Sequence, residues 1–353
     1  MFQDITVEEL LELQKDREIA LIDVRSPSEF ADFAIEGSRN IPFFDDAERA
    51  EIGTLYKQVS ILAAKERGLE IVSQKLPGFV KQFTEIPERK AVYCWRGGMR
   101  SKTTATVLSM MGIHVYRIDG GIRQYRKWVI DTLESFVFQP HCIVLNGYTG
   151  TGKTKLLRTL AAEGYPVLDL EGLAGHRGSI FGQIGLEPKN QKQFESGLVH
   201  ELLRLNHFPC VFIEAESKRV GKVTLPEFLI RAKEAGTQFF LDLPQAERVK
   251  HILEDYQPAD HQQEVLAAFE RIQKRIHTPA AAEIEQDLRE GRYASAVALL
   301  LEYYYDQRYE YAASQYPEEP ILLKAERMED ALPLLRTEYD RICREQASAA
   351  KSV

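Results

Sequence analysis

Cys94-Trp95-Arg96-Gly97-Gly98-Met99-Arg100-Ser101 is the stretch that decides the fold of the first part of this chain. The cysteine follows an apolar run at 91–93 and a helical pattern starts at Ser101, so the order is strand, loop, helix. Backbone N–H groups that are freed at a helix start attract negative charge. They also favour the thiolate, which is the nucleophilic form of cysteine. We therefore predict that Cys94 is a nucleophile in a loop suited to an anionic donor of sulfur or selenium.

Strand and helix signals alternate on both sides of this loop. Apolar runs predict strands at 19–24, 90–95 and 114–118, and helical patterns begin at Thr6 and Ser101. Strands that alternate with helices form a parallel sheet, and the loops after the strands carry the chemistry. The sequence thus predicts an α/β domain over residues 1–135.

A second loop with a chemical pattern is Gly147-Tyr148-Thr149-Gly150-Thr151-Gly152-Lys153-Thr154, between an apolar run at 141–146 and a helical pattern at 155–163. This is the phosphate-binding pattern Gly-x-x-x-x-Gly-Lys-Thr in its strand-to-helix setting. We expect the loop N–H groups around Gly147, Gly150 and Gly152 to wrap phosphate oxygens, Lys153 to add a positive charge, and Thr154 to be able to hold Mg²⁺. The pattern indicates a phosphate or diphosphate and does not specify ATP.

The alternation continues to the end of the chain. Further strands are predicted at 166–170, 209–215, 238–243 and 320–324, with a helical region at about 246–315 between the last two. This order predicts a P-loop α/β domain with a helical insertion over residues 136–353. A guanine-reading Asn-Lys-x-Asp motif does not occur in the sequence, which argues against a GTPase.

Composition narrows the class of protein. With 353 residues, 44% hydrophobic and 28% charged, the chain is long enough for two globular domains. A net charge of −8 argues against wholesale nucleic-acid binding and leaves room for a local basic face. The four cysteines are far apart, as in a protein of the reducing cytoplasm. Neither a signal peptide nor a membrane-spanning run is evident, so we expect a cytoplasmic protein with no membrane partner.

Arginines flank the cysteine loop. We expect Arg96 and Arg100 to clamp a phosphate-bearing donor, together with Gly97, Gly98 and Ser101, because guanidinium groups match phosphate oxygens in pairs. The alternative is a solvated loop. Residues 94–128 carry seven Lys/Arg against one acidic residue, which predicts either an RNA-backbone patch or a solvated basic helix. Aromatic side chains interleave with this patch: Trp95, Tyr116, Tyr125 and Trp128.

A second group of polar residues follows the strands of the P-loop domain. Asp169, Glu171, His176 and Arg177 lie in a glycine-containing segment after the strand at 166–170, which predicts a substrate-facing loop. His176 would serve acid–base chemistry, RNA binding or a structural hydrogen bond. Glu214, at the end of the strand at 209–215, is the candidate for a metal-linked carboxylate, although the usual residue there is Asp.

Other conspicuous side chains are predicted to be structural. Cys142 and Cys210 start apolar strands, and Cys343 lies on the last helix. The tyrosine-rich run 303–311 is expected to pack against the leucines at 299–301 rather than stack on bases.

Three separated motifs of the first domain resemble the rhodanese family: Asp23-Val24-Arg25, Asn40-Ile41-Pro42 and the Cys94 loop. The resemblance implies that Cys94 carries sulfane sulfur as a persulfide. It also implies that Asp23 and Arg25 are structural, as a paired buried charge.

Taken together, the cysteine loop, the P-loop and the stretch Asp169 to Ser179 resemble the tRNA 2-selenouridine synthase family over residues 4–320. The resemblance implies that selenium from selenophosphate replaces the sulfur of wobble 2-thiouridine in tRNA, after S-geranylation with geranyl diphosphate. Cys94 would carry selenium as a selanylsulfide or deliver it from bound selenophosphate. No tightly bound cofactor is expected beyond Mg²⁺ at Thr154.

Two questions stay open at this point. We expect the P-loop to bind the diphosphate of the geranyl donor, with selenophosphate and a nucleotide as rivals. An ATP-dependent small-molecule kinase or sulfurtransferase is the alternative function, and a non-catalytic docking domain is disfavoured because Cys94 is present in its loop.

Overall fold

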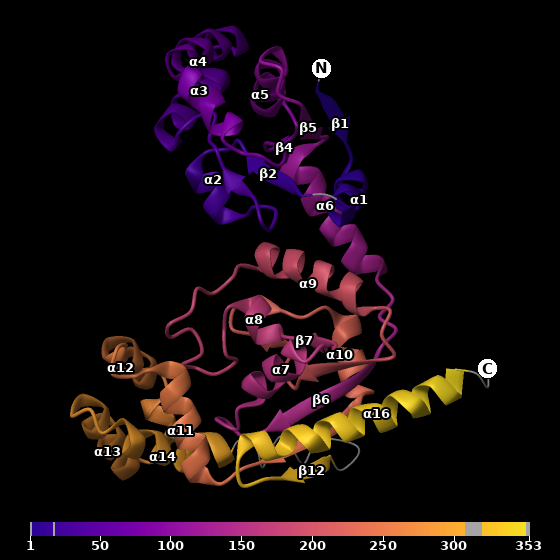
Figure 1. The fold of residues 1–353 in the computed structure, drawn as a ribbon. Coiled ribbons are helices and arrows are strands. Elements are labelled where there is room, and N and C mark those ends of the chain that lie inside the picture. Colours follow the sequence, from indigo (N-terminus) through magenta and orange to yellow (C-terminus); the bar gives the residue numbers. More distant parts are fainter. Residues whose placement is uncertain (1, 17, 308–319, 351–353) are drawn as a thin grey trace. The chain divides into compact units, whose positions relative to one another are not determined.

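The computed structural model describes residues 2–16, 18–307 and 320–350, and the chain divides into two compact units (Figure 1). The first unit comprises residues 1–135 with residues 195–197, and the second comprises residues 136–194 and 198–353. None of the described helices is long and apolar enough to cross a lipid bilayer.

The first unit is a five-stranded, wholly parallel sheet with strand order β1-β5-β4-β2-β3. Its strands are β1 (Gln3–Ile5), β2 (Ile19–Asp23), β3 (Arg39–Asn40), β4 (Arg89–Tyr93) and β5 (Val115–Ile118). Its helices are α1 (Val7–Asp16), α2 (Pro27–Asp32), α3 (Asp46–Gln58), α4 (Ile61–Thr84), α5 (Met99–Met110) and α6 (Gly121–Ser135). The predicted strands and the helix after the cysteine loop are present, so this part of the predicted α/β fold is confirmed.

The central strands are apolar because both faces of the sheet are covered. Strand β4 is buried over its last four residues, and its Val92 packs with Phe79 and Phe83 of α4 in the main apolar cluster. Phe43, Phe79 and Phe83 meet edge to face, with ring centroids 5.6 and 5.1 Å apart. This core fixes the end of β4, where the cysteine loop begins.

Helices α3 and α4 lie outside the predicted elements. Their N-termini nevertheless carry capping residues that the sequence contains. The Asp45 carboxylate accepts the N–H of Glu48 at the start of α3, and the Ser60 hydroxyl accepts the N–H of Ala63 at the start of α4. The Asp45–Glu48 capping pair would therefore have located the start of α3, whereas α4 has only the single cap Ser60.

The second unit is also a five-stranded parallel sheet, with strand order β12-β11-β6-β8-β7. Its strands are β6 (His141–Gly147), β7 (Val167–Leu168), β8 (Cys210–Glu214), β11 (Thr237–Asp242) and β12 (Ile321–Lys324), and a small hairpin is formed by β9 (Arg219–Val220) and β10 (Val223–Thr224). Helices that accompany the sheet are α7 (Lys153–Ala162), α8 (Leu170–Ala174), α9 (Gln191–Leu205), α10 (Glu227–Glu234), η3 (Met328–Asp330) and α16 (Ala331–Ala350).

The predicted helical insertion lies between β11 and β12 (orange in Figure 1). It consists of α11 (Gln245–Tyr256), α12 (Gln262–Glu270), η1 (Gln273–Arg275), α13 (Thr278–Arg289), α14 (Tyr293–Leu300) and the π-helical turn η2 (Leu301–Asp306). These helices share an apolar core of their own that includes Phe269, Ile284 and Tyr304. Tyr304 thus packs as predicted, while positions 308–311 of the tyrosine-rich run lie outside the described residues.

One predicted strand is shorter than expected. The run at 166–170 forms only the two-residue strand β7, and α8 begins at Leu170. The reason is Asp169, whose side chain accepts the N–H of Gly172 and caps the new helix. The chain turns away from the sheet at this residue, so Glu171 lies on a helix.

Candidate functional site

Cys94 follows directly on β4, at the carboxyl edge of the first sheet. The residue is only 3% exposed, and its side chain packs against the apolar cluster below the loop. Its Sγ lies 3.2 Å from the hydroxyl oxygen of Ser101, in the first turn of α5. A substrate that donates sulfur or selenium must therefore reach the Cys94 sulfur from the side of the loop. The Ser101 hydroxyl already contacts that sulfur.

The carbonyl groups of the cysteine loop are bound from outside the loop. Strand β5, the residues that follow it and the first turn of α5 supply the donors. The N–H of Ile122 donates to the Cys94 carbonyl oxygen at 2.9 Å, and the N–H of Arg123 donates to the Trp95 oxygen at 3.1 Å. The Arg117 guanidinium donates to the Gly97 oxygen, and the N–H of Lys102 donates to the Gly98 oxygen at 3.1 Å. The loop thus directs its carbonyls away from the anion cradle.

The N–H groups of the same loop remain open. For residues 95–101, no acceptor for the backbone N–H groups occurs among the residues that the structure describes. Several uncommitted N–H groups next to a helix start form a binding site for an anion. The predicted cradle of Gly97, Gly98 and Ser101 is therefore available around the thiol.

Gly121 makes this arrangement sterically feasible. Its φ is +59°, and a Cβ added there would lie 2.1 Å from the Cys94 carbonyl oxygen. Only glycine lets the start of α6 approach the loop closely enough for the N–H of Ile122 to reach that oxygen. The sequence analysis of the loop itself missed this residue, although the pair Gly120-Gly121 after β5 is a visible signal.

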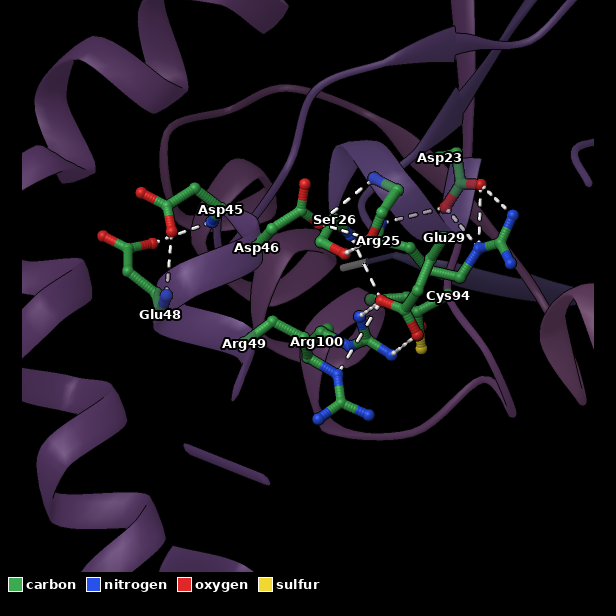
Figure 2. A network of polar contacts seen from close by, with 12 residues as sticks. Asp23, Arg25, Ser26, Glu29, Asp45, Asp46, Glu48, Arg49, Cys94 and Arg100 are labelled. Atoms are coloured by element: carbon green, nitrogen blue, oxygen red, sulfur yellow. Dashed lines mark hydrogen bonds and ion pairs between the residues drawn. The ribbon is translucent and has the colours of Figure 1, made fainter. Parts of the chain in front are cut away.

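The two predicted anion-clamping arginines have different surroundings. Arg100 forms an ion pair with Glu29, using both of its terminal nitrogens (Figure 2), and its side chain is 14% exposed. Partial burial favours the protonated form of Glu29, but the hydrogen bonds and charge of Arg100 lower its pKa below the ordinary value. Arg96 is exposed. Anion binding by Arg100 stays a prediction and would require exchange of its Glu29 partner.

The Asp23–Arg25 pair lies inside the first unit, as the predicted buried charge pair. Asp23 is 0% and Arg25 1% exposed, and the guanidinium also donates to the carbonyl oxygen of Phe33. Burial raises the pKa of Asp23 in spite of the hydrogen bonds and charge of Arg25. The side chain of Asn40 donates to the carbonyl oxygens of Asp23 and Arg25 at 2.9 and 3.0 Å, which links two of the motifs.

Fewer basic side chains of the stretch 94–128 are exposed and unpaired than its composition indicates. Arg117 is paired with Asp4, and Arg100 is paired with Glu29. Of the four interleaved aromatic residues, Tyr116 and Tyr125 are buried, whereas Trp95 is exposed. The basic residues of the patch that are exposed are Arg96, Lys102, Arg123 and Lys127.

The P-loop lies between β6 and α7, as predicted. Lys153 donates from Nζ to the carbonyl oxygens of Gly147 and Tyr148, at 2.8 and 3.1 Å. The N–H groups of Gly152, Lys153 and Thr154 have no acceptor within the described ranges 2–16, 18–307 and 320–350. The loop therefore combines a movable positive charge with open N–H groups, which is the chemistry that binds phosphate groups.

Carboxyl groups surround the first turn of α7. The Thr154 hydroxyl donates to Glu171 at 2.7 Å, and the N–H of Glu171 donates to Glu214 at 3.1 Å. Burial and the charge of Glu216 raise the pKa of Glu171 to about 7. Burial and the charge of Glu171 raise the pKa of Glu214 well above its usual value. Glu171 and Glu214 are thus brought together beside Thr154.

Glu216 and Lys233 complete this group and were not predicted. Burial raises the pKa of Glu216, despite the nearby charges of Lys153 and Lys233. Burial lowers the pKa of Lys233 to about 8, and its Nζ donates to the Glu216 carbonyl oxygen. Glu216 stands two residues after Glu214, so the spacing was a usable signal, whereas Lys233 comes from α10 and only the fold reveals it.

The remaining predicted residues of the loop after β7 have structural partners. Asp169 caps α8 and pairs with Arg158 at 3.1 Å. His176 accepts the N–H of Gly178 at Nδ1, and burial together with the Arg177 charge lowers its pKa, so the imidazole is neutral at pH 7. Arg177 donates to backbone carbonyls and lies 4.8 Å over the ring of Tyr256. Acid–base roles for Asp169 and His176 stay predictions.

Cys142 and Cys210 are buried at 1% and 0% exposure, as predicted for structural cysteines. Burial raises the pKa of the Cys142 thiol to about 12, which keeps it protonated at neutral pH. Cys343 packs against the apolar cluster of the second unit that contains Cys210. Among the cysteines, only Cys94 lies in a loop of open N–H groups.

Mg²⁺ is the metal ion that the P-loop pattern implies. No group of three His, Cys, Asp or Glu side chains in the described part of the chain is arranged to hold a metal. A P-loop Mg²⁺ needs only one or two protein oxygens, since phosphates and water supply the others. Glu214 Oε1 is buried without a partner among the described residues, and the neighbouring carboxyls repel one another. This cluster of carboxyl and hydroxyl oxygens fits Mg²⁺.

These features define the class of the protein: a rhodanese-like domain with a cysteine anion cradle, joined to a P-loop domain. Residues 6–127 match the rhodanese-like domain family, and residues 140–340 match the tRNA 2-selenouridine synthase AAA domain. The chain belongs to the tRNA 2-selenouridine synthase family and is an enzyme.

Relatives with that name come from several bacteria. The protein of Aeromonas salmonicida is 33% identical over 83% of this chain and 87% of its own length. The protein of Hydrogenovibrio crunogenus is 35% identical over 84% of this chain and 89% of its own. The protein of Nitrosomonas europaea is 39% identical over 67% of this chain and 63% of its own.

Replacing Gly121 by Ala should destabilise the first unit strongly. The methyl group would enter the space of the Cys94 carbonyl at a left-handed backbone position. We expect a loss in the free energy of unfolding well above the roughly 1–2 kcal/mol of left-handed strain alone. Urea unfolding of the full chain measures it. Gly37→Ala is the matched control, since Gly37 has a φ of +76° and no atom within 4 Å of an added Cβ. Equal losses for the two variants would contradict the steric argument.

Replacing Asp23 by Asn should cost about 3–5 kcal/mol in the free energy of unfolding, because it leaves the buried Arg25 charge uncompensated. The same urea titration measures this loss. Glu12→Gln is the control: it removes an ion pair with Lys15 in which both side chains are 69% exposed. We expect little change for the control. A stable Asp23→Asn protein would show that the pair is dispensable for folding.

Proposed function

We propose that this enzyme converts 2-thiouridine at the wobble position of tRNA to 2-selenouridine, in two steps. Geranyl diphosphate first alkylates the sulfur of the base, and selenium from selenophosphate then replaces the alkylated sulfur. Family membership supports the overall conversion. The observation that carries the two-step form is the presence of two separate anion sites in one chain: the open N–H groups around Cys94 and the P-loop.

The first step is assigned to the P-loop domain. The sulfur of the base attacks C1 of geranyl diphosphate, the C–S bond forms, and the C–O bond breaks. The electron pair of that bond leaves on diphosphate, and the base releases its N3 proton to solvent. Open N–H groups at 152–154 and the ammonium of Lys153 would stabilise the charge that develops on the leaving diphosphate. Thr154 and Glu171 would hold Mg²⁺, which supplies further positive charge to the same leaving group.

The second step is assigned to the cysteine loop. Alkylation converts a poor leaving group into a thiol, so selenium can displace it at C2 of the base. The C–Se bond forms and the C–S bond breaks. The geranyl thiolate departs with the electron pair and takes a proton from solvent. Water then cleaves the P–Se bond and releases phosphate.

Selenium is at the same oxidation level in selenophosphate and in 2-selenouridine. A selanylsulfide on Cys94 would need a two-electron oxidant, so we favour delivery of selenium directly from bound selenophosphate. The open N–H groups of residues 95–101 and the exposed Arg96 would hold the phosphate portion, with the selenium against Cys94 Sγ. Ser101, 3.2 Å from that sulfur, would orient it.

Replacing Lys153 by Ala should abolish S-geranylation. Loss of a charged hydrogen-bonding partner typically removes about 1.5–3 kcal/mol, so we expect roughly 10- to 100-fold weaker binding of inorganic diphosphate. Calorimetry measures the binding, and mass spectrometry of 2-thiouridine-containing tRNA measures the transfer. Lys155→Ala is the matched control, because this lysine stands two residues further along the same helix and is 53% exposed. Intact geranyl transfer in Lys153→Ala, with selenation abolished, would show that the loop does not bind the geranyl donor.

Replacing Cys94 by Ser should separate the two steps. Serine lacks the polarisable sulfur that would contact the selenium, so we expect geranylated tRNA to accumulate while 2-selenouridine falls by at least about 100-fold. Mass spectrometry of tRNA from cells that carry the variant measures both bases. Cys142→Ser, at a buried cysteine of the other unit, is a control for general loss of enzyme. Unchanged 2-selenouridine in Cys94→Ser would remove Cys94 from the mechanism.

A further inference from the structure

Trp95 follows Cys94 directly, in the loop whose open N–H groups surround the thiol. Its side chain is 45% exposed. Neither a ring contact nor a hydrogen bond of the indole N–H joins Trp95 to any of the described residues. The backbone holds the residue in place instead, since the Trp95 carbonyl oxygen accepts the N–H of Arg123 at 3.1 Å. The indole ring is therefore free to contact a ligand bound at the cysteine loop.

The other aromatic rings of the stretch 94–128 are engaged within the protein. Trp128 stacks on the buried Tyr125, with ring centroids 5.7 Å apart and ring planes 29° apart. Tyr116 is buried and meets the ring of His114 edge to face at 4.9 Å. A single exposed apolar side chain is ordinary on a protein surface. What distinguishes Trp95 is its position beside the candidate nucleophile.

Positive charges surround the backbone of Trp95. They come from the loop itself, from the first turn of α5 and from the first two turns of α6, and they belong to Arg96, Lys102, Arg123 and Lys127. All four side chains are exposed and have no acidic partner in the described part of the chain. Arg123 and Lys127 are four residues apart, so they share one face of α6. An exposed aromatic ring among unpaired Lys and Arg side chains is the combination that binds single-stranded nucleic acid.

The second step of the proposed reaction requires a particular orientation of the base. Selenium attacks C2 of the pyrimidine from one face of the ring, because the π orbital of that carbon lies above and below the ring plane. The open N–H groups of the loop would hold the phosphate portion of the selenium donor, and they do not orient the base. A flat side chain that stacks on the opposite face would hold the base still while leaving the attacked face open.

We propose that Trp95 is the stacking platform for the alkylated wobble base at the cysteine loop, and that Arg123 and Lys127 contact the phosphates beside this base. The inference rests on the proposed function and deepens its second step. The indole supports the face of the base that selenium does not attack. The single-stranded backbone of the anticodon loop crosses the start of α6, where the two positive charges lie on one helix face.

Fluorescence of Trp95 tests the stacking directly on the full chain. The sequence contains two tryptophans, so Trp128→Phe leaves Trp95 as the sole indole. One probe is an anticodon stem-loop RNA with S-geranyl-2-thiouridine at the wobble position, and the other is the same RNA with an abasic site there. Selenophosphate is omitted, so the first RNA is not converted. We expect the first RNA to quench the emission of Trp95 and the abasic RNA to leave it unchanged, while anisotropy of labelled RNA shows that both bind.

Replacing Trp95 is the second arm of the experiment. Trp95→Ala should bind the base-containing RNA roughly 5- to 150-fold more weakly, which corresponds to the loss of one stacked base, and should bind the abasic RNA as before. Trp95→Phe keeps a flat ring and should retain most of the affinity. Tyr56→Ala is the matched control, because this aromatic side chain is 58% exposed on α3 of the same unit. Thermal unfolding shows that each variant is folded.

The phosphate contacts have their own readout. Arg123→Gln and Lys127→Gln should each lower the slope of log affinity against log salt concentration by about 0.7, the value for one phosphate of a single strand. Both RNAs should show this change, and the preference for the base-containing RNA should stay. Lys57→Gln, at an exposed lysine of α3, is the control and should leave the slope unchanged. Unchanged slopes in both α6 variants would overturn the placement of the phosphates.

The outcomes separate this inference from the proposed function. Quenching of Trp95 by both RNAs or by neither would overturn the stacking, and so would wild-type affinity of Trp95→Ala for the base-containing RNA. If the enzyme then still converts the geranylated RNA to 2-selenouridine with selenophosphate, the proposed function stands and the inference alone fails. If the unaltered enzyme binds the geranylated RNA and does not convert it, the proposed second step fails together with this inference.

Discussion

Backbone N–H groups around Cys94 can face an anion only because other parts of the first unit bind the carbonyl groups of the same loop. The start of α6, the Arg117 guanidinium and the first turn of α5 each supply a donor to a loop carbonyl. A short loop must direct its carbonyls somewhere, and an unpaired buried carbonyl is costly. The chemistry of the cysteine thus depends in part on Arg117, Ile122 and Arg123, which come twenty or more positions after the loop carbonyls they bind.

The P-loop, the second candidate anion site, combines hydrogen-bond donors with nearby carboxyl groups. The P-loop supplies open N–H groups and Lys153, but three glutamates with raised pKa values crowd the same end of the sheet. Without a ligand, Lys153 donates to carbonyls of its own loop. Binding a diphosphate with Mg²⁺ would give this lysine an anionic partner and give the carboxyls a cation. On the proposed function, both the lysine and the carboxyls would thus have favourable partners in the ligand.

Sequence reasoning succeeds where a local pattern has one physical meaning. The strand–loop–helix settings of Cys94 and Lys153, the buried Asp23–Arg25 pair and the burial of Cys142 all follow from short runs of sequence. It fails where partners come from distant segments. Glu29 as the partner of Arg100, and Lys233 beside Glu216, depend on contacts that no periodicity encodes.

The aromatic residues of the basic stretch show a related limit. Tyr116 and Tyr125 alternate with arginines in the sequence, as they would in a nucleic-acid surface, yet both are buried. The sequence does not distinguish a tyrosine whose ring is buried and whose hydroxyl is hydrogen-bonded from a tyrosine that stacks on a base. Composition could therefore indicate the exposed lysines and arginines, but not which rings reach the surface.

The helical insertion explains why a P-loop domain of this kind needs more than its phosphate loop. A phosphate site alone accepts nucleotides, selenophosphate and alkyl diphosphates with little discrimination, because all present similar oxygens. Discrimination has to come from the remainder of the ligand. In this chain the element that packs against the loop is α11, whose Arg248 is neutralised by Asp306 and whose Ile252 and Tyr256 face an uncharged cavity. The insertion thus places uncharged side chains beside the P-loop.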